Sequence, residues 1–70
     1  MQISIHTEYI ELFALLKLAG LAETGGQGKE IIRAGVVLLD GIVATELRKK
    51  VRPGSIVQVQ DQTIEVVASV

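Results

Sequence analysis

Apolar and polar positions divide the chain into segments with different periods. Residues 1–5 alternate between apolar and polar side chains, as in a half-buried strand. In residues 8–19 the apolar side chains recur three and four positions apart, which predicts a helix with Thr7 as its N-cap and Gly20 as its stop. After residue 35 short β-branched runs predict strands instead.

The first predicted helix is apolar on two faces. One face consists of Leu12, Leu15, Leu16 and Ala19. The other face consists of Ile10, Phe13, Ala14 and one cation, Lys17. Two apolar faces are typical of a core helix that a neighbouring element covers.

Residues 24–35 predict a second, shorter helix with a marked start and stop. Thr24 and Gln27 are three positions apart, as in a capping box, and Gly35 fits a left-handed cap at the end. Beyond this helix, residues 40–41 (Asp-Gly) predict a hairpin turn between two strands. Residues 46–52 read as a polar connection, and a last pair of strands follows the Pro-Gly turn at 53–54.

The start of the second helix is unusual because it contains three glycines, at positions 25, 26 and 28. Each glycine inside a helix costs about 1 kcal/mol relative to alanine, but it lets another group approach the backbone closely. Lys29 and Arg33 are four positions apart and share one helix face. Since free N–H groups at a helix start attract anions, this segment is a candidate phosphate contact.

The order of these elements is strand, helix, helix and then several strands. This order predicts an α+β fold, with the helices segregated from a small, mostly antiparallel β-sheet. The 70 residues suffice for one domain over 1–70, and 49% of them are hydrophobic, which excludes a disordered tail.

Several function classes find no support in the composition. Cysteine is absent, which excludes disulfides and cysteine-ligated metals and fits a reducing cytoplasm. We expect no signal peptide, because the N-terminus has no basic segment followed by an apolar run. We expect no membrane span, because no apolar run is long enough. His6 is the single histidine, and residues 25–30 lack the Ser/Thr and the spacing of a P-loop. We therefore expect no catalysis, no metal and no cofactor.

Positive charge is concentrated in a chain whose net charge is only −1. Four of the seven Lys and Arg residues fall within five positions: Arg48, Lys49, Lys50 and Arg52. If this loop folds back beside the second helix, its cations join Lys29 and Arg33 on one face and can neutralise several phosphates. The alternative interpretation is a solvated loop that keeps an edge strand from pairing, next to an ordinary exposed helix face.

Four blocks of the chain together resemble the S4-like RNA-binding domain, also called the alpha-L motif. Residues 10–20 (IELFALLKLAG) resemble its opening helix, and residues 24–29 (TGGQGK) stand where Ser-Arg-x-x-Ala-Arg or Lys is usual. Residues 32–41 (IRAGVVLLDG) and 51–57 (VRPGSIV) resemble its later segments. More narrowly, the first two blocks resemble a short stand-alone bacterial subgroup described as YaaA- or YbcJ-like.

The resemblance implies a two-helix alpha-L motif on the sheet and structured RNA, such as ribosomal or transfer RNA, as the partner. We expect a cytoplasmic monomer, for which association with the ribosome is one candidate. Carried over by position, the RNA contacts are Lys17, Thr24, Gln27, Lys29, Arg33, Arg48, Lys49, Lys50 and Arg52. The chain departs from the pattern where glycine at 25 or 26 replaces the usual arginine, Gly28 the usual alanine and Ser55 the usual aspartate.

Two other functions stay open on the sequence alone. A protein-interaction module would use the second apolar face of the first helix, around Phe13, as its partner surface. A small β-grasp sulfur carrier has a similar size, but it needs a C-terminal Gly-Gly, and residues 68–70 are Ala-Ser-Val.

Overall fold

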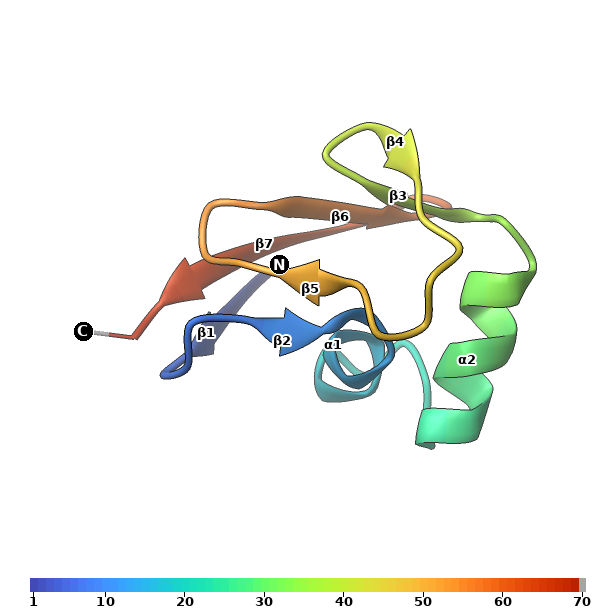
Figure 1. Cartoon of the computed structure of the whole chain (residues 1–70), viewed down its shortest axis with the longest axis horizontal. Helices are drawn as coiled ribbons and strands as arrows, with labels where there is room; N and C mark the ends of the chain where they lie inside the picture. The colour runs from blue at the N-terminus through green and yellow to red at the C-terminus, as the bar shows by residue number, and fades with distance from the viewer. Residues whose placement is uncertain (70) are drawn as a thin grey trace.

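Alternating apolar side chains in the last third of the chain build the centre of a five-stranded sheet. The computed structural model describes residues 1–69, so Val70, the end of the domain predicted over 1–70, lies outside the described residues. The strands of this sheet are β1 (Gln2–Ile5), β3 (Val37–Leu39), β4 (Ile42–Val43), β6 (Ile56–Val59) and β7 (Gln62–Ala68). Their spatial order is β1-β7-β6-β3-β4, and β1 runs parallel to β7 while the other pairs are antiparallel (Figure 1). The predicted mostly antiparallel sheet is confirmed.

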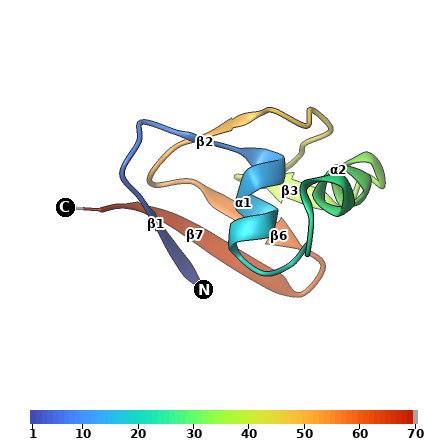
Figure 2. The same ribbon diagram turned by 90° about the horizontal axis from the view of Figure 1, so that it is seen from below.

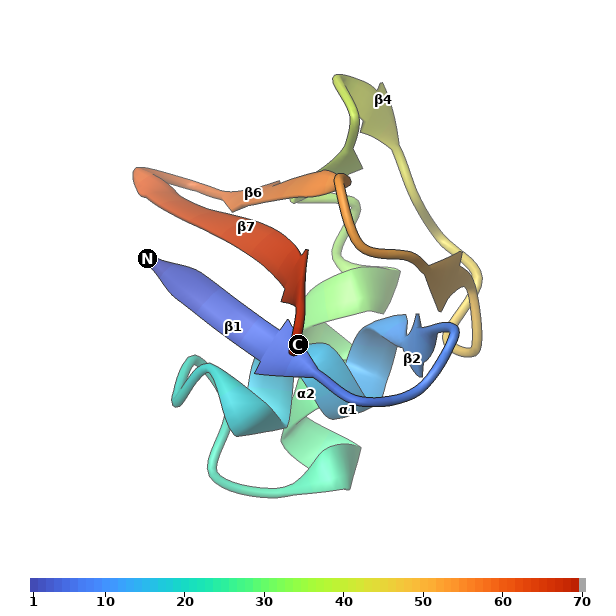
Figure 3. The same ribbon diagram turned by 90° about the vertical axis from the view of Figure 1, so that its left-hand side faces the viewer.

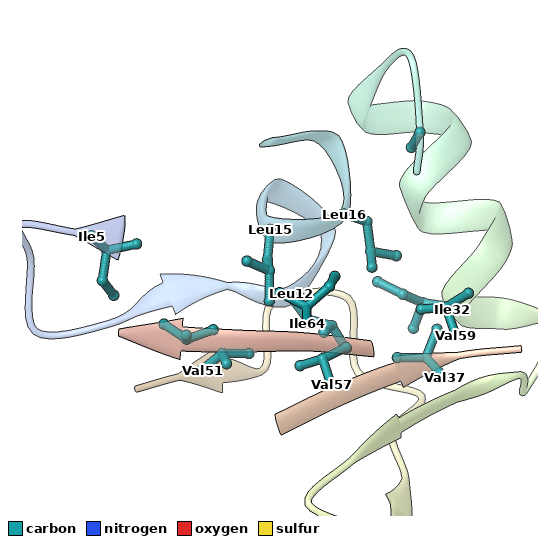
Figure 4. Packing of buried hydrophobic residues seen from close by; sticks show 12 residues of the cluster. Ile5, Leu12, Leu15, Leu16, Ile32, Val37, Val51, Val57, Val59 and Ile64 are labelled. Atoms are coloured by element: carbon teal, nitrogen blue, oxygen red, sulfur yellow. The ribbon is translucent and has the colours of Figure 1, made fainter. Parts of the chain in front are cut away.

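Two helices, α1 (Leu12–Leu18) and α2 (Gly25–Arg33), lie on one face of this sheet (Figure 2). The core between the two layers is aliphatic, and its fully buried side chains include Leu12, Leu15, Leu16, Ile32, Val37, Val57, Ile64 and Val66 (Figure 4). The leucine face predicted for the first helix is therefore the one that packs on the sheet. Removing such side chains from water is the main favourable term in folding.

The prediction that the first helix begins at residue 8 is wrong, because α1 begins at Leu12. The two residues before it form β2 (Ile10–Glu11), which pairs with β5 (Lys50–Val51) in a second, two-stranded antiparallel sheet, hereafter the ribbon (Figure 3). Thr7 does not cap the helix, since its hydroxyl donates to the Tyr9 carbonyl oxygen at 2.7 Å.

The start of α1 is instead set by the segment 46–52, hereafter the basic loop. The backbone N–H of Leu12 donates to the Lys49 carbonyl oxygen (2.9 Å). The N–H of Phe13 donates to the Leu47 carbonyl oxygen (3.1 Å). First-turn N–H groups have no partner within their own helix, so these two long-range bonds replace a local cap.

The basic loop is also more than the polar connection that was predicted. It contains β5, and Val51 is fully buried in the core. A single apolar residue between cations is too short a pattern to predict a strand, and only the pairing with β2 reveals it.

The predicted start and stop of the second helix are confirmed, but the capping box differs in one bond, because the Gln27 side chain accepts from Glu23 and not from the N-cap. Thr24 is the N-cap, and its hydroxyl accepts from the Gln27 N–H at 3.1 Å. The Gln27 side-chain oxygen accepts from the N–H of Glu23, one residue before the cap, at 2.6 Å. At the other end Gly35 has φ +75°, a left-handed conformation that suits glycine.

The predicted hairpin turn is also confirmed. Asp40 and Gly41 both have positive φ, 51° and 85°, as a two-residue turn between β3 and β4 requires. The Asp40 carboxylate additionally accepts from the N–H of Ile56 at 2.8 Å, which ties the turn to β6.

Candidate functional site

Phe13, in the first turn of α1, contacts both regions that the sequence predicted to be basic. Its N–H is bonded to the basic loop at Leu47, as described above. Its ring lies under α2: the Lys29 ammonium is 5.1 Å from the ring centroid, and a Cβ placed on Gly25 would be 3.6 Å from the ring edge. One half-buried residue thus holds the basic loop and the start of α2 next to each other (Figures 1 and 2).

The close approach of the two helices explains Gly28. This glycine is buried, and an added Cβ would lie 3.0 Å from the Phe13 carbonyl oxygen. The glycine-rich start therefore allows close approach, as predicted, but at position 28 the group that approaches is the backbone of α1.

The ribbon has one face toward the core and one toward solvent. Ile10 pairs with Val51. Val51 belongs to the buried core, and Ile10 packs against it. Since side chains alternate along a strand, Tyr9, Glu11, Lys50 and Arg52 lie on the other face.

The outer side chains of the ribbon make close contacts with each other. The Lys50 ammonium is 4.9 Å from the centroid of the Tyr9 ring, and the Arg52 guanidinium carbon is 6.0 Å from it. Nearby, Arg48 Nε lies 3.8 Å from a carboxylate oxygen of Glu11. The ribbon thus presents an aromatic ring beside cations.

The predicted contact residues consequently fall into two groups around two rings, not into one cluster. In the first group the Lys29 ammonium lies over the Phe13 ring, and Arg33 follows one turn later on α2. Lys50 and Arg52 lie at Tyr9.

The remaining predicted contacts have other surroundings. Lys17 is exposed in the last turn of α1, while the Thr24 and Gln27 side chains already cap α2. The Lys49 side chain borders a hollow of about 330 Å³ beside β3 and β4.

Comparison with known proteins places this geometry in a family. The sequence profile of the S4 domain family matches residues 3–67. The chain belongs to the S4 domain family. The YbcJ protein of Escherichia coli (strain K12) is 42% identical to it over 60 residues, which are 86% of each chain.

Solved structures agree with this assignment. The solution structure of E. coli YbcJ, described as revealing an alphaL motif involved in RNA binding, has a TM-score of 0.76 and 38% identity, and the match covers 96% of this chain and 86% of YbcJ. The 30S ribosomal protein S4e of Thermoplasma acidophilum has a TM-score of 0.64 at 18% identity, over 81% of this chain and 30% of S4e, and shows the same fold. The resemblance to the alpha-L motif and to the YbcJ-like subgroup is confirmed.

All the cations of this S4 domain are accessible to water. Among residues 1–69 no polar or charged side chain is fully buried. Within the same residues no group of three or more His, Asp and Glu side chains is placed to hold a metal ion. No helix of the described part of the chain is long and apolar enough to cross a membrane.

Sequence reasoning did not include Tyr9 among the site residues of the S4 domain. The alternation in residues 9–11 and 50–52, with one apolar residue between polar or aromatic ones in each segment, was the available sign of two short paired strands. Each segment is too short to be distinguished from a loop without its partner.

Proposed function

We propose that this S4 domain binds structured RNA, of the ribosomal or transfer RNA type, mainly through phosphates that contact α2 and the basic loop. The observation that carries the proposal is the position of Phe13, which fixes the loop to the first turn of α1 and receives Lys29 on its ring. Two basic elements that are far apart in sequence are thereby adjacent. The description of the related YbcJ structure as an RNA-binding motif supports the same ligand.

The contacts proposed are the seven cations and the two capping side chains of α2. They are Lys17, Thr24, Gln27, Lys29, Arg33, Arg48, Lys49, Lys50 and Arg52. Six of these cations are exposed and Lys29 is half-buried. Binding them to phosphates releases counterions, so the affinity should fall steeply as salt rises. Within this proposal the protein acts as a cytoplasmic monomer that binds without catalysis or cofactor, and the ribosome is a candidate place of action.

The alternative function, a protein-interaction surface on the second face of the first helix, has less area available than the sequence suggested. Phe13 lies against α2, and Ile10 packs against the core from β2. The second apolar face is therefore largely covered by neighbouring elements, as its pattern predicted, and little of it is left for a partner.

The test neutralises the two α2 cations. Lys29→Gln with Arg33→Gln should lower the affinity for transfer RNA or a ribosomal RNA fragment at least tenfold at low salt, because two phosphate contacts are lost. In a salt series measured by fluorescence anisotropy, the slope of log affinity against log salt should become shallower by about 2.

A matched control separates location from net charge. Ser4→Glu with Gln58→Glu also makes the protein two charges more negative, but both residues are exposed on β1 and β6, on the sheet face opposite the helices. The control should keep most of the affinity. Absence of wild-type binding at low salt would contradict the proposed function. An equal loss of RNA affinity in both double variants would show that α2 does not contact the RNA.

A further inference from the structure

The outer face of the ribbon carries the second aromatic group, and the core does not account for it. Tyr9 is 37% exposed and does not belong to the core cluster, to which the ribbon contributes Val51 from its other face. The Thr7 hydroxyl holds the Tyr9 carbonyl, so the backbone that precedes β2 is fixed. A ring kept at the surface by ordered backbone is available to a ligand.

The charges around this ring favour an anionic ligand. Lys50 and Arg52 lie 4.9 and 6.0 Å from the ring centroid. The one carboxylate on this face, that of Glu11, has Arg48 at 3.8 Å, which offsets its charge. Both cations lie over the ring, and both belong to long, exposed side chains that can turn from the ring to a phosphate. A nucleotide offers both partners, a flat base for the ring and a phosphate on each side for the cations.

We propose that the outer face of the ribbon binds one unpaired nucleotide of the RNA, with its base stacked on Tyr9 and its flanking phosphates on Lys50 and Arg52. The inference rests on the proposed function and adds to it a preference for RNA with a bulge, a loop or a strand end. Bases inside a duplex are stacked on each other and expose no face to a side chain, whereas unpaired bases do. Since β5 is part of the basic loop, phosphates bound by the preceding cations of the loop lead to this nucleotide.

The experiment compares two RNAs that differ only in unpaired bases. One is a blunt duplex, and the other is the same duplex with three unpaired nucleotides in the middle of one strand. The wild type should bind the bulged duplex about tenfold more tightly, which is the contribution typical of one base stacked on an aromatic side chain. Tyr9→Leu should bring the ratio of the two affinities close to one, while Tyr9→Phe, which keeps the ring, should preserve most of it.

A second measurement reports on Tyr9 directly in the intact protein. Tyr9 is the single tyrosine, so incorporation of 3-fluorotyrosine yields one ¹⁹F resonance. The bulged duplex should shift this resonance and the blunt duplex should shift it far less. The control for Tyr9→Leu is Ile42→Ala, which removes apolar area from an exposed position on β4. It should change the affinity for neither the blunt nor the bulged duplex.

The outcomes separate the two proposals. If the wild type binds both duplexes equally, or if the bulged duplex binds without moving the ¹⁹F resonance, the nucleotide site is overturned while RNA binding stands. If the wild type binds neither these duplexes nor the transfer RNA of the first test, both proposals fall.

Discussion

At the scale of single residues, the glycines of α2 have different surroundings although they share a helix. An added Cβ at Gly28 would meet the Phe13 carbonyl oxygen at 3.0 Å and Ala22 at 3.7 Å. At Gly26, which is exposed, the nearest atom would be the Thr24 hydroxyl oxygen at 3.8 Å, an ordinary contact. Position 28 is therefore constrained by helix packing, and position 26 is not.

This difference predicts opposite results for two alanine substitutions. Gly26→Ala should stabilise the protein by about 0.5–1 kcal/mol, because alanine loses less backbone entropy in a helix. Gly28→Ala gains the same helix propensity but presses on the backbone of α1, so its stability should not exceed that of the wild type. Urea or thermal unfolding measures both, and an equal gain at the two positions would show that the helices can separate at no cost.

At the scale of elements, the ends of the two helices are fixed in different ways. The caps of α2 come from residues within or next to it, namely Thr24, Gln27 and Gly35, and the sequence predicted both ends. The start of α1 depends on carbonyls at Leu47 and Lys49, more than 30 residues away. A local pattern holds no information about such partners, which is why the predicted start was four residues early.

The same distinction applies to the site. The cations could be proposed as contacts from the sequence because Lys and Arg are recognisable by type wherever the fold puts them. Tyr9 could not be proposed, because its place beside Lys50 and Arg52 follows from the pairing of β2 with β5, two residues with two. The adjacency of α2 and the basic loop was only a condition in the charge argument, and Phe13, which contacts both elements, is visible only in the structure.

The long-range bonds at α1 predict an unusual pattern of amide exchange. First-turn amides normally exchange quickly, because water is their partner. Here the amides of Leu12 and Phe13 should exchange slowly, since the basic loop accepts from both. Hydrogen exchange followed by NMR can compare them with Gly26, an exposed residue in the first turn of α2. Equal, fast exchange at all three positions would mean that the loop leaves α1 in solution.

At the scale of the whole molecule, the placement of charge matters more than its sum. The net charge is −1, yet every Lys and Arg of the chain is among the proposed RNA contacts. Against seven cations, four of the eight acidic residues lie on or beside the proposed surface: Glu11, Glu23, Glu30 and Glu46. Among them Glu11 lies 3.8 Å from a proposed contact, Arg48. A nearly neutral protein can thus present a basic surface to RNA.

Glu11 is therefore expected to weaken RNA binding while contributing little to folding. Its contact with Arg48 is exposed and 3.8 Å long, and such pairs are worth about 0–1 kcal/mol. Glu11→Gln should lower the unfolding free energy by no more than about 1 kcal/mol. It should raise the RNA affinity about two- to fivefold, because a repelling charge is removed and Arg48 is released.

Glu65→Gln is the matched control, since it makes the same change of charge on β7, where the Glu65 carboxylate accepts from the Gln2 amide. An equal rise in affinity for both variants, measured at one salt concentration, would assign the effect to net charge and not to the ribbon.

The bonds between the basic loop and α1 also determine which substitutions the loop tolerates. They use main-chain carbonyls of residues 47 and 49, which every amino acid possesses. The side chains of Arg48, Lys49 and Lys50 are exposed and make none of these main-chain bonds, although Arg48 contacts Glu11 and Lys50 lies over Tyr9. Substitution there can alter which RNA is preferred while the loop stays docked, so the fold leaves this short segment open to evolutionary drift and to library-based redesign.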